Sequence, residues 1–228
     1  MNESLFFGLN IKPKLFKNET DKIKKPIQFK FENENENENE NEKQIKQIST
    51  GYFGTIFLFE NGKAIEYLNN SKQKSEKVQI EENIQKVTVG VGNEAILTIE
   101  GNVFAKGKDI NPNNPNKFIN ISSLIEDTND RIIKDVVSGA NSVYLLTSNQ
   151  YVYGIGSNSS GQLGLDSEAL KKTEKPILIM ENISKIFSGN SSYSVFLLNL
   201  NQELFGCGNN NYGQLGLGKI KKRRNKNS

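Results

Sequence analysis

The sequence of 228 residues contains no histidine, no tryptophan and a single cysteine, Cys207. Without histidine there is no His-based metal site, no imidazole general acid or base, and no Ser–His or Cys–His catalytic pair. One cysteine excludes an intramolecular disulfide framework and is typical of a reducing compartment. We therefore predict no catalytic residue, no cofactor, no metal and no small-molecule substrate.

Long apolar runs are also missing. No stretch approaches the roughly 18 uninterrupted apolar residues of a membrane span. The first residues, Met1 to Ser4, lack the basic region that opens a secretory signal. These absences favour an intracellular protein, cytoplasmic or nuclear, that does not act in a membrane.

Two segments carry charge of a single sign, whereas the rest of the chain mixes acidic and basic residues. The tract 32–42 holds six Glu and no cation, and the last ten residues hold six cations and no anion. Without these segments the chain has 23 basic and 20 acidic residues, so the body lacks the basic excess of a phosphate-binding surface and we expect no nucleic-acid partner for it.

Those two segments set the expected domain boundaries. Alternating Glu and Asn in 32–43 repel one another and offer nothing to bury, which is typical of a disordered insertion. The tail 219–228 is basic and poor in apolar residues, which also indicates disorder. We predict one repeat domain over 1–218, interrupted by the insertion and followed by the tail.

What the sequence does contain is a repeat. A segment that starts at Tyr153 and reads Y-G-I-G-S-N-S-S-G-Q-L-G-L returns 52 residues later, from Phe205, as F-G-C-G-N-N-N-Y-G-Q-L-G-L. Four glycines lead the successive units, 39, 49 and 50 residues apart. We expect the repeat glycines to supply positive φ or close backbone approach; they are Gly51, Gly90, Gly139, Gly156, Gly161, Gly164, Gly189, Gly208, Gly213 and Gly216.

Each unit reads as short strands between turns. A strand-like run precedes the lead glycine, and an apolar strand, a tight hairpin and a third strand follow it. In the first unit Asn61-Gly62 predicts a hairpin with a type I′ turn, which needs positive φ at both central residues. A fourth strand is expected in the linking segments, at 118–121 and 176–180. Four-stranded units repeated around an axis are β-propeller blades.

Two further features of the sequence do not follow that pattern. The Asn- and Pro-rich stretch 108–116 replaces the G-Q-L-G turn in the second unit and predicts a surface loop. The carboxylates Asp109, Glu126, Asp127 and Asp130 show no repeating or converging spacing, so we interpret them as solvated loop charges.

These motifs resemble the regulator-of-chromosome-condensation repeat. The segments 156–164 and 208–216 match its closing turn, Gly-x-Asn-x-x-Gly-Gln-Leu-Gly, without a gap. The likeness is strong over 136–218, partial over 45–107 and weak over 1–31. It implies an all-β propeller fold, of which this chain shows about four four-stranded blades, a partial or open arc of the family's seven-bladed propeller. An open arc would leave a bare sheet face and bare strand edges.

The chain departs from the family at its aromatic positions. The family's tryptophan is replaced by Phe7, Lys106, Ile155 and Cys207, and near its histidine stand Gly54, Glu94 and Tyr193. In the family these positions serve packing, so we interpret their loss as divergence.

The function most consistent with these features is a non-enzymatic protein-interaction scaffold, whose partners bind loops at a propeller rim. The alternative, by family likeness alone, is a guanine-nucleotide exchange factor or regulator of a Ran-like small GTPase. No stretch matches the family's exchange or nucleosome-binding elements. The basic run Lys221, Lys222, Arg223 and Arg224 reads either as a nuclear-import signal or as an ordinary solvated end.

Overall fold

The computed structural model describes residues 5–6, 27–28, 44–52, 54–68, 77–80 and 83–216. Within them the chain forms one short two-stranded sheet and four antiparallel sheets that succeed one another along the sequence. The predicted insertion 32–43 and tail 219–228, with the basic run 221–224, lie outside the described residues, so the predicted domain boundaries stay predictions. No helix in the described ranges is long and apolar enough to cross a membrane.

Before the four larger sheets, β1 (Leu5–Phe6) pairs with β2 (Ile27–Gln28) in the short sheet. The first two of the larger sheets follow the predicted repeat. The first sheet has the order β3-β4-β5-β6 and the second β7-β8-β9-β10. Their bounds are β3 Ile45–Thr50, β4 Gly54–Phe59, β5 Ala64–Leu68, β6 Lys77–Ile80, β7 Ile84–Val89, β8 Asn93–Thr98, β9 Val103–Gly107 and β10 Ile119–Asn120.

The last two sheets differ in strand number. The third has the order β11-β12-β13-β14, and the fourth has three described strands, β15-β16-β17. Two 3₁₀ turns, η2 (Ser122–Leu124) and η3 (Thr128–Asp130), link the second sheet to the third. The strands are β11 Ile133–Ser138, β12 Ser142–Thr147, β13 Val152–Ser157, β14 Lys172–Met180, β15 Ile183–Ser188, β16 Ser194–Asn199 and β17 Leu204–Gly208.

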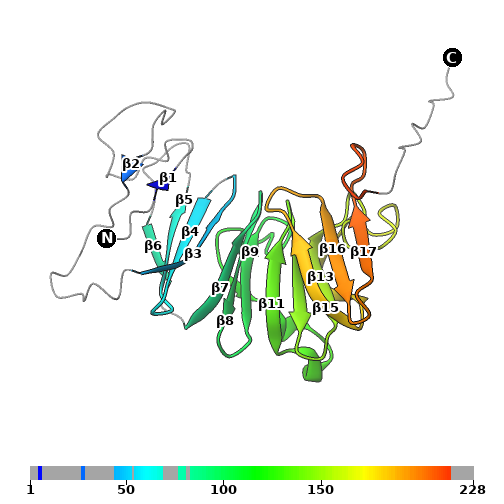
Figure 1. Cartoon of the computed structure of the whole chain (residues 1–228), viewed down its shortest axis with the longest axis horizontal. Coiled ribbons are helices and arrows are strands. Elements are labelled where there is room, and N and C mark those ends of the chain that lie inside the picture. Colours follow the sequence, from blue (N-terminus) through cyan, green and yellow to red (C-terminus); the bar gives the residue numbers. More distant parts are fainter. Residues whose placement is uncertain are drawn as a thin grey trace, which may run out of the picture.

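The sheets stand face to face in chain order, with the first and the fourth at opposite ends of the row (Figure 1). Strand β7 contacts both β3 and β11, and β11 contacts β15, so the first strands of the sheets share one inner side. Apolar clusters fill the three spaces between neighbouring sheets. The chain is therefore an open arc of propeller blades, as predicted.

In each of the four sheets, the hairpin between the second and third strands has the same loop geometry. In the first, the Phe59 N–H donates to the Lys63 carbonyl and the Gly62 N–H to the Phe59 carbonyl, both at 3.0 Å. Gly62 has φ +79°, whereas Asn61 does not have a positive φ. The predicted type I′ turn is therefore wrong: the loop has three residues and one left-handed position. In the successive hairpins, the residue at this left-handed position is Gly62, Gly101, Gln150 and Gln202.

The linking segments behave as predicted, with one addition. The predicted fourth strands at 118–121 and 176–180 appear as β10 and β14. Residues 112–117 are exposed, as expected of a surface loop. Ile110 of the same loop, however, is buried in the cluster between the second and third sheets, so the loop is anchored at its start.

Candidate functional site

The predicted repeat glycines fall into three structural groups. Those of the two closing turns all have a left-handed φ, between +70° and +78°. Gly156 and Gly208 also have positive φ, and a Cβ on either would collide with the backbone of a neighbouring strand. The closing-turn group consists of Gly161, Gly164, Gly213 and Gly216.

Three of the four lead glycines lie where the backbones of neighbouring sheets approach closely. A Cβ on Gly51 would strike the Gly90 carbonyl oxygen, and one on Gly90 would strike that of Gly139. A Cβ on Gly139 would likewise lie 2.8 Å from the Ser192 carbonyl oxygen. Gly189 has no such neighbour, because its Cβ would lie 3.5 Å from the nearest atom. The series of close approaches therefore includes three of the four lead glycines.

The closing turn holds itself together through side-chain amides. The buried Asn158 accepts from the Leu163 N–H at 2.9 Å, and its amide group donates to the Leu170 carbonyl at 2.7 Å. Gln162 accepts from the Ser160 N–H at 2.8 Å. Leu163 is fully buried against the fourth sheet. These residues therefore form blade scaffold.

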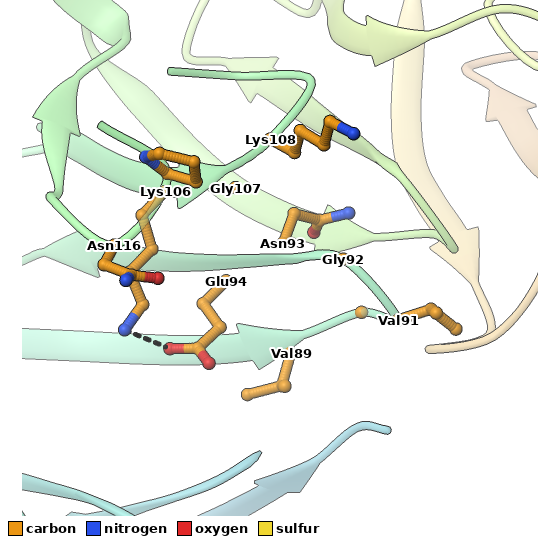
Figure 2. A pocket seen from close by; sticks show the side chains of 11 residues that line it. Val89, Val91, Gly92, Asn93, Glu94, Lys106, Gly107, Lys108 and Asn116 are labelled. Atoms are coloured by element: carbon orange, nitrogen blue, oxygen red, sulfur yellow. Dashed lines mark ion pairs between the residues drawn. The ribbon is translucent and has the colours of Figure 1, made fainter. Parts of the chain in front are cut away.

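A recess opens at the end of the second sheet where the lead glycines lie. We call it the rim recess; its volume is about 230 Å³. It is formed by the loop between β7 and β8, the start of β8, the end of β9 and the loop that follows. Figure 2 shows the Lys106 side chain reaching past Asn116 to the Glu94 carboxylate. The lining residues are Val89, Gly90, Val91, Gly92, Asn93, Glu94, Lys106, Gly107, Lys108, Pro115 and Asn116.

Three buried ionisable side chains lie beneath the rim recess, between the first two sheets. Lys106 Nζ lies 2.6 Å from Glu66 Oε1 and donates a hydrogen bond to it. The same nitrogen lies 3.2 Å from Glu94 Oε2 in an ion pair without hydrogen-bond geometry. It also lies 4.8 Å from the centre of the Phe118 ring. We call Glu66, Glu94 and Lys106 the charge triad.

The charge triad occupies positions that are small or apolar in the third and fourth sheets. Strand register aligns the facing pair Glu94–Lys106 with Val143–Ile155 in the third sheet and Val195–Cys207 in the fourth. In the same register, Glu66 aligns with Ala105 and Gly154. The sequence interpretation treated Glu94 and Lys106 as lost packing positions and missed their pairing. Opposite charges on one cross-strand pair were a usable signal.

Burial shifts the titration of the charge triad. Desolvation, followed by the negative charge of Glu66, raises the pKa of Glu94 from 4.5 to about 8, although Lys106 pulls in the opposite direction. At neutral pH Glu94 is therefore mainly protonated, which leaves one anion and one cation in the triad. The recess floor is close to electrically neutral.

Cys207 and two of the loop carboxylates have identifiable surroundings. Burial raises the pKa of the Cys207 thiol to about 11, so almost no thiolate exists at neutral pH. In the described ranges no three His, Cys, Asp or Glu residues could hold a metal ion. Of the loop carboxylates, Glu126 is exposed and Asp127 accepts from the Asn129 N–H at 2.9 Å at the start of η3.

Comparison with known proteins places the fold. Residues 133–162, which span β11 to the closing turn of the third sheet, match the regulator of chromosome condensation (RCC1) repeat. The chain is 30% identical over 127 residues to the protein RCC2 homolog of Xenopus laevis, covering 53% of this chain and 24% of that protein.

Solved structures share the fold at low sequence identity. Human WBSCR16 superposes with a TM-score of 0.68 at 14% identity, over 90% of this chain and 56% of that one. Prp20p of Saccharomyces cerevisiae gives 0.53 at 18% identity, over 78% of this chain and 46% of that one. The chain thus spans between a quarter and about half of these relatives. Residues 133–162 are therefore similar to an RCC1 repeat, and the four sheets share the β-propeller fold of these solved structures without closing.

Proposed function

We propose that this protein is a scaffold that binds protein partners through its rim loops, at the rim recess. The observation that supports this most directly is the recess itself, a preformed hollow where two loops meet at the end of a sheet. Loops on a rigid scaffold are common binding positions, because the scaffold holds their geometry at low entropic cost.

The chemistry of the rim recess suits a side chain of a partner. Val89 and Val91 offer apolar wall, and the exposed Lys108 places a cation at the mouth. The floor is nearly neutral, so a partner group needs no full counter-charge to enter. We propose that a partner loop inserts one side chain here while Lys108 contacts an acidic residue beside it.

The test compares partner recovery for two charge-altered chains. Proteins recovered by proximity labelling with the native chain are compared with those recovered by the Val91→Arg/Lys108→Glu variant, which blocks the recess and reverses its charge. Glu100→Lys, in the exposed hairpin at the other end of the same sheet, is the matched control. Loss of a defined set of proteins with the recess variant alone supports the proposal; equal recovery from all three chains contradicts it.

A second candidate is a regulator of a small GTPase. It is raised by Prp20p, whose crystal structure is described together with its binding to Gsp1p and histones. The direct test is release of mant-GDP from Ran-type and Rab-type GTPases. Acceleration by micromolar protein would favour this candidate, and an unchanged release rate would remove it for those GTPases.

A further inference from the structure

The floor of the rim recess has more buried acceptor oxygens than N–H groups to pair with them. Glu66 and Glu94 each have one oxygen, Oε2 in both, that is buried and has no hydrogen-bond partner among the described residues. The hydrogen bond that Lys106 Nζ donates goes to Glu66 Oε1. Because buried polar groups are normally hydrogen-bonded, unpaired oxygens at the bottom of a hollow favour a ligand that brings donors.

Of the two carboxyl groups, that of Glu94 is the one a ligand can reach. Glu94 lines the recess, whereas Glu66 lies beneath it. Lys106 contacts one Glu94 oxygen at 3.2 Å, without hydrogen-bond geometry, and the other oxygen points away from Lys106 (Figure 2). Lys106 is itself held from two sides, by Glu66 at 2.6 Å and by the Phe118 ring at 4.8 Å. Glu94 therefore needs a donor from outside the charge triad.

A cation supplies that donor better than a neutral group. Burial, followed by the charge of Glu66, raises the pKa of Glu94 to about 8, so its proton is easily lost near neutral pH. A neutral donor would make an ordinary hydrogen bond, whereas a cation would stabilise the ionised carboxylate through a charge-assisted bond that is roughly twice as strong. Loss of the proton gives the charge triad one net negative charge, which an entering cation neutralises.

The wall and the mouth of the recess favour arginine beside an acidic residue. A hollow of about 230 Å³ with Val89 and Val91 in its wall can accommodate a planar guanidinium and its methylene stem. The guanidinium fork can also meet one carboxylate through two hydrogen bonds. The exposed Lys108 at the mouth would repel a cation that arrives alone. An acidic neighbour of the arginine would pair with Lys108 and remove that repulsion.

We propose that the rim recess binds an arginine side chain of a protein partner, next to an acidic residue of the same partner, and that the Glu94 carboxylate is the counter-ion of the arginine. The arginine enters already charged and Glu94 releases its proton to solvent, so one proton leaves for each arginine bound. The inference rests on the proposed scaffold function and adds the chemistry of the side chain that the recess accepts.

The probe is an acetylated and amidated peptide, Gly-Ser-Arg-Glu-Ser-Gly, added to the full chain labelled with nitrogen-15 and followed by NMR. We expect saturable shifts at the amides of Val91, Gly92 and Lys108, and none at Glu100 in the hairpin at the other end of the sheet. The matched peptide carries citrulline, which has the shape of arginine without its charge. It should bind at least fivefold more weakly at pH 8.

Proton release gives the arginine peptide a distinctive pH profile. The described charged groups that face Glu94 are Glu66 from β5 and Lys106 from β9, and β7 places Val89 opposite it. Because binding requires the ionised form of Glu94, affinity should rise close to tenfold from pH 6 to pH 7 and level off above about pH 8. The citrulline peptide should show no such rise.

A variant that cannot ionise isolates the role of Glu94. Glu94→Gln keeps the size of the protonated side chain, so it should remove both the preference for arginine over citrulline and the rise of affinity with pH. Glu100→Gln, in the exposed hairpin of the same sheet, is the matched control and should retain both. The two peptides and the pH series are compared on the native chain, so they remain decisive if Glu94→Gln is unstable.

Several results would overturn the proposal. Equal affinity of the two peptides from pH 6 to pH 9 would exclude a counter-ion role for Glu94, and shifts confined to residues outside the recess would exclude the site. Recess shifts that grow with protein concentration without peptide would assign the recess to a second copy of the chain.

The scaffold function can fail separately from this inference. Loss of partners from the Val91→Arg/Lys108→Glu variant, without a preference for arginine over citrulline, would remove the inference and leave the scaffold function. A preference for arginine that the same variant abolishes, with unchanged partner recovery, would remove the scaffold function and leave the chemistry of the recess.

Discussion

At the scale of single residues, identical amino acids in one sequence pattern have different structural roles. Gly90 and Gly189 both lead a repeat unit, yet only Gly90 lies against the backbone of the next sheet. Spacing along the chain cannot distinguish them, because the distinction depends on which sheet follows. The structure therefore separates two substitutions that the sequence treats as equivalent.

Gly90→Ala should destabilise the fold by about 2–3 kcal/mol, because the new methyl group overlaps the Gly139 carbonyl and the sheets must move apart. Gly189→Ala is the matched control. Its Cβ would have ordinary contacts, so we expect a neutral change or a gain of about 0.5 kcal/mol from reduced unfolded-state entropy. Urea denaturation of both variants measures the difference; equal losses would contradict the close approach.

The buried Glu94 predicts a pH dependence. Its pKa is about 8 in the folded chain and 4.5 when unfolded, so the folded state binds the extra proton between these values. The resulting stabilisation is complete below about pH 4.5 and is lost as pH rises through about 8. Because each pKa unit corresponds to about 1.4 kcal/mol, we expect this to remove on the order of 5 kcal/mol from the unfolding free energy.

Glu94→Gln keeps the shape of the protonated side chain and cannot titrate. Its unfolding free energy should therefore fall less steeply with pH than that of the native chain, with the largest difference near pH 8 and above. Urea denaturation from pH 5 to 9 measures both slopes. Glu100→Gln, at an exposed position, should leave the slope almost unchanged; parallel profiles for the Glu94 variant and the native chain would contradict the assignment.

At the scale of elements, the hairpins show where sequence reasoning reached its limit. Asn61-Gly62 is compatible with both a two-residue and a three-residue loop, and only strand register chooses between them. The three-residue loop places Gln150 at φ +71° and Gln202 at φ +65°. A side chain at a left-handed position is strained, so these two loops are less stable than those with glycine.

Gln150→Gly should therefore stabilise the chain by about 0.5–1 kcal/mol, the relief of strain less the added unfolded-state entropy. The same gain is expected for Gln202→Gly. Ser148→Gly, in the same hairpin but without positive φ, should lose a similar amount. Thermal unfolding followed by circular dichroism ranks the three variants; a loss for both Gln variants would refute the strain argument.

The charge triad belongs to an interface between two sheets, and it too has a matched replacement. Glu66→Ala, Glu94→Val and Lys106→Ile together copy Ala105, Val143 and Ile155 of the next interface. Replacing a buried ionic group by packed apolar residues is often neutral or stabilising by about 1–4 kcal/mol. Lys106→Ile alone should instead cost about 3–5 kcal/mol, since it leaves the buried Glu66 carboxylate unpaired. Urea denaturation of the single and triple variants compares them directly.

At the scale of the whole molecule, the sequence was sufficient for the architecture. The closing turns at 156–164 and 208–216 contain the glycine, Asn and Gln contacts that build a blade, so local strings predicted the sheets and their order. The charge triad was missed because Glu66 and Lys106 are 40 residues apart and meet only when two blades stack.

The inner loops give the arc a link between its ends. The Asn190 amide group donates to the Thr50 carbonyl at 2.7 Å, joining the loop after β15 to the end of β3. The neighbouring backbones make similar bonds, from the Gly92 N–H to the Ala140 carbonyl and from the Ala140 N–H to the Ser192 carbonyl, both at 2.8 Å. All four sheets therefore converge on one inner rim while their outer edges remain apart.

The charge triad also bears on how such a chain could grow by duplication. A repeat copied between the second and third sheets, or between the third and fourth, would meet small or aliphatic residues at the aligned positions on both sides. A repeat inserted between the first and second would separate Glu66 from Lys106 and leave each facing a hydrocarbon surface. The boundary between the first two blades is therefore the one that an added repeat would disrupt most.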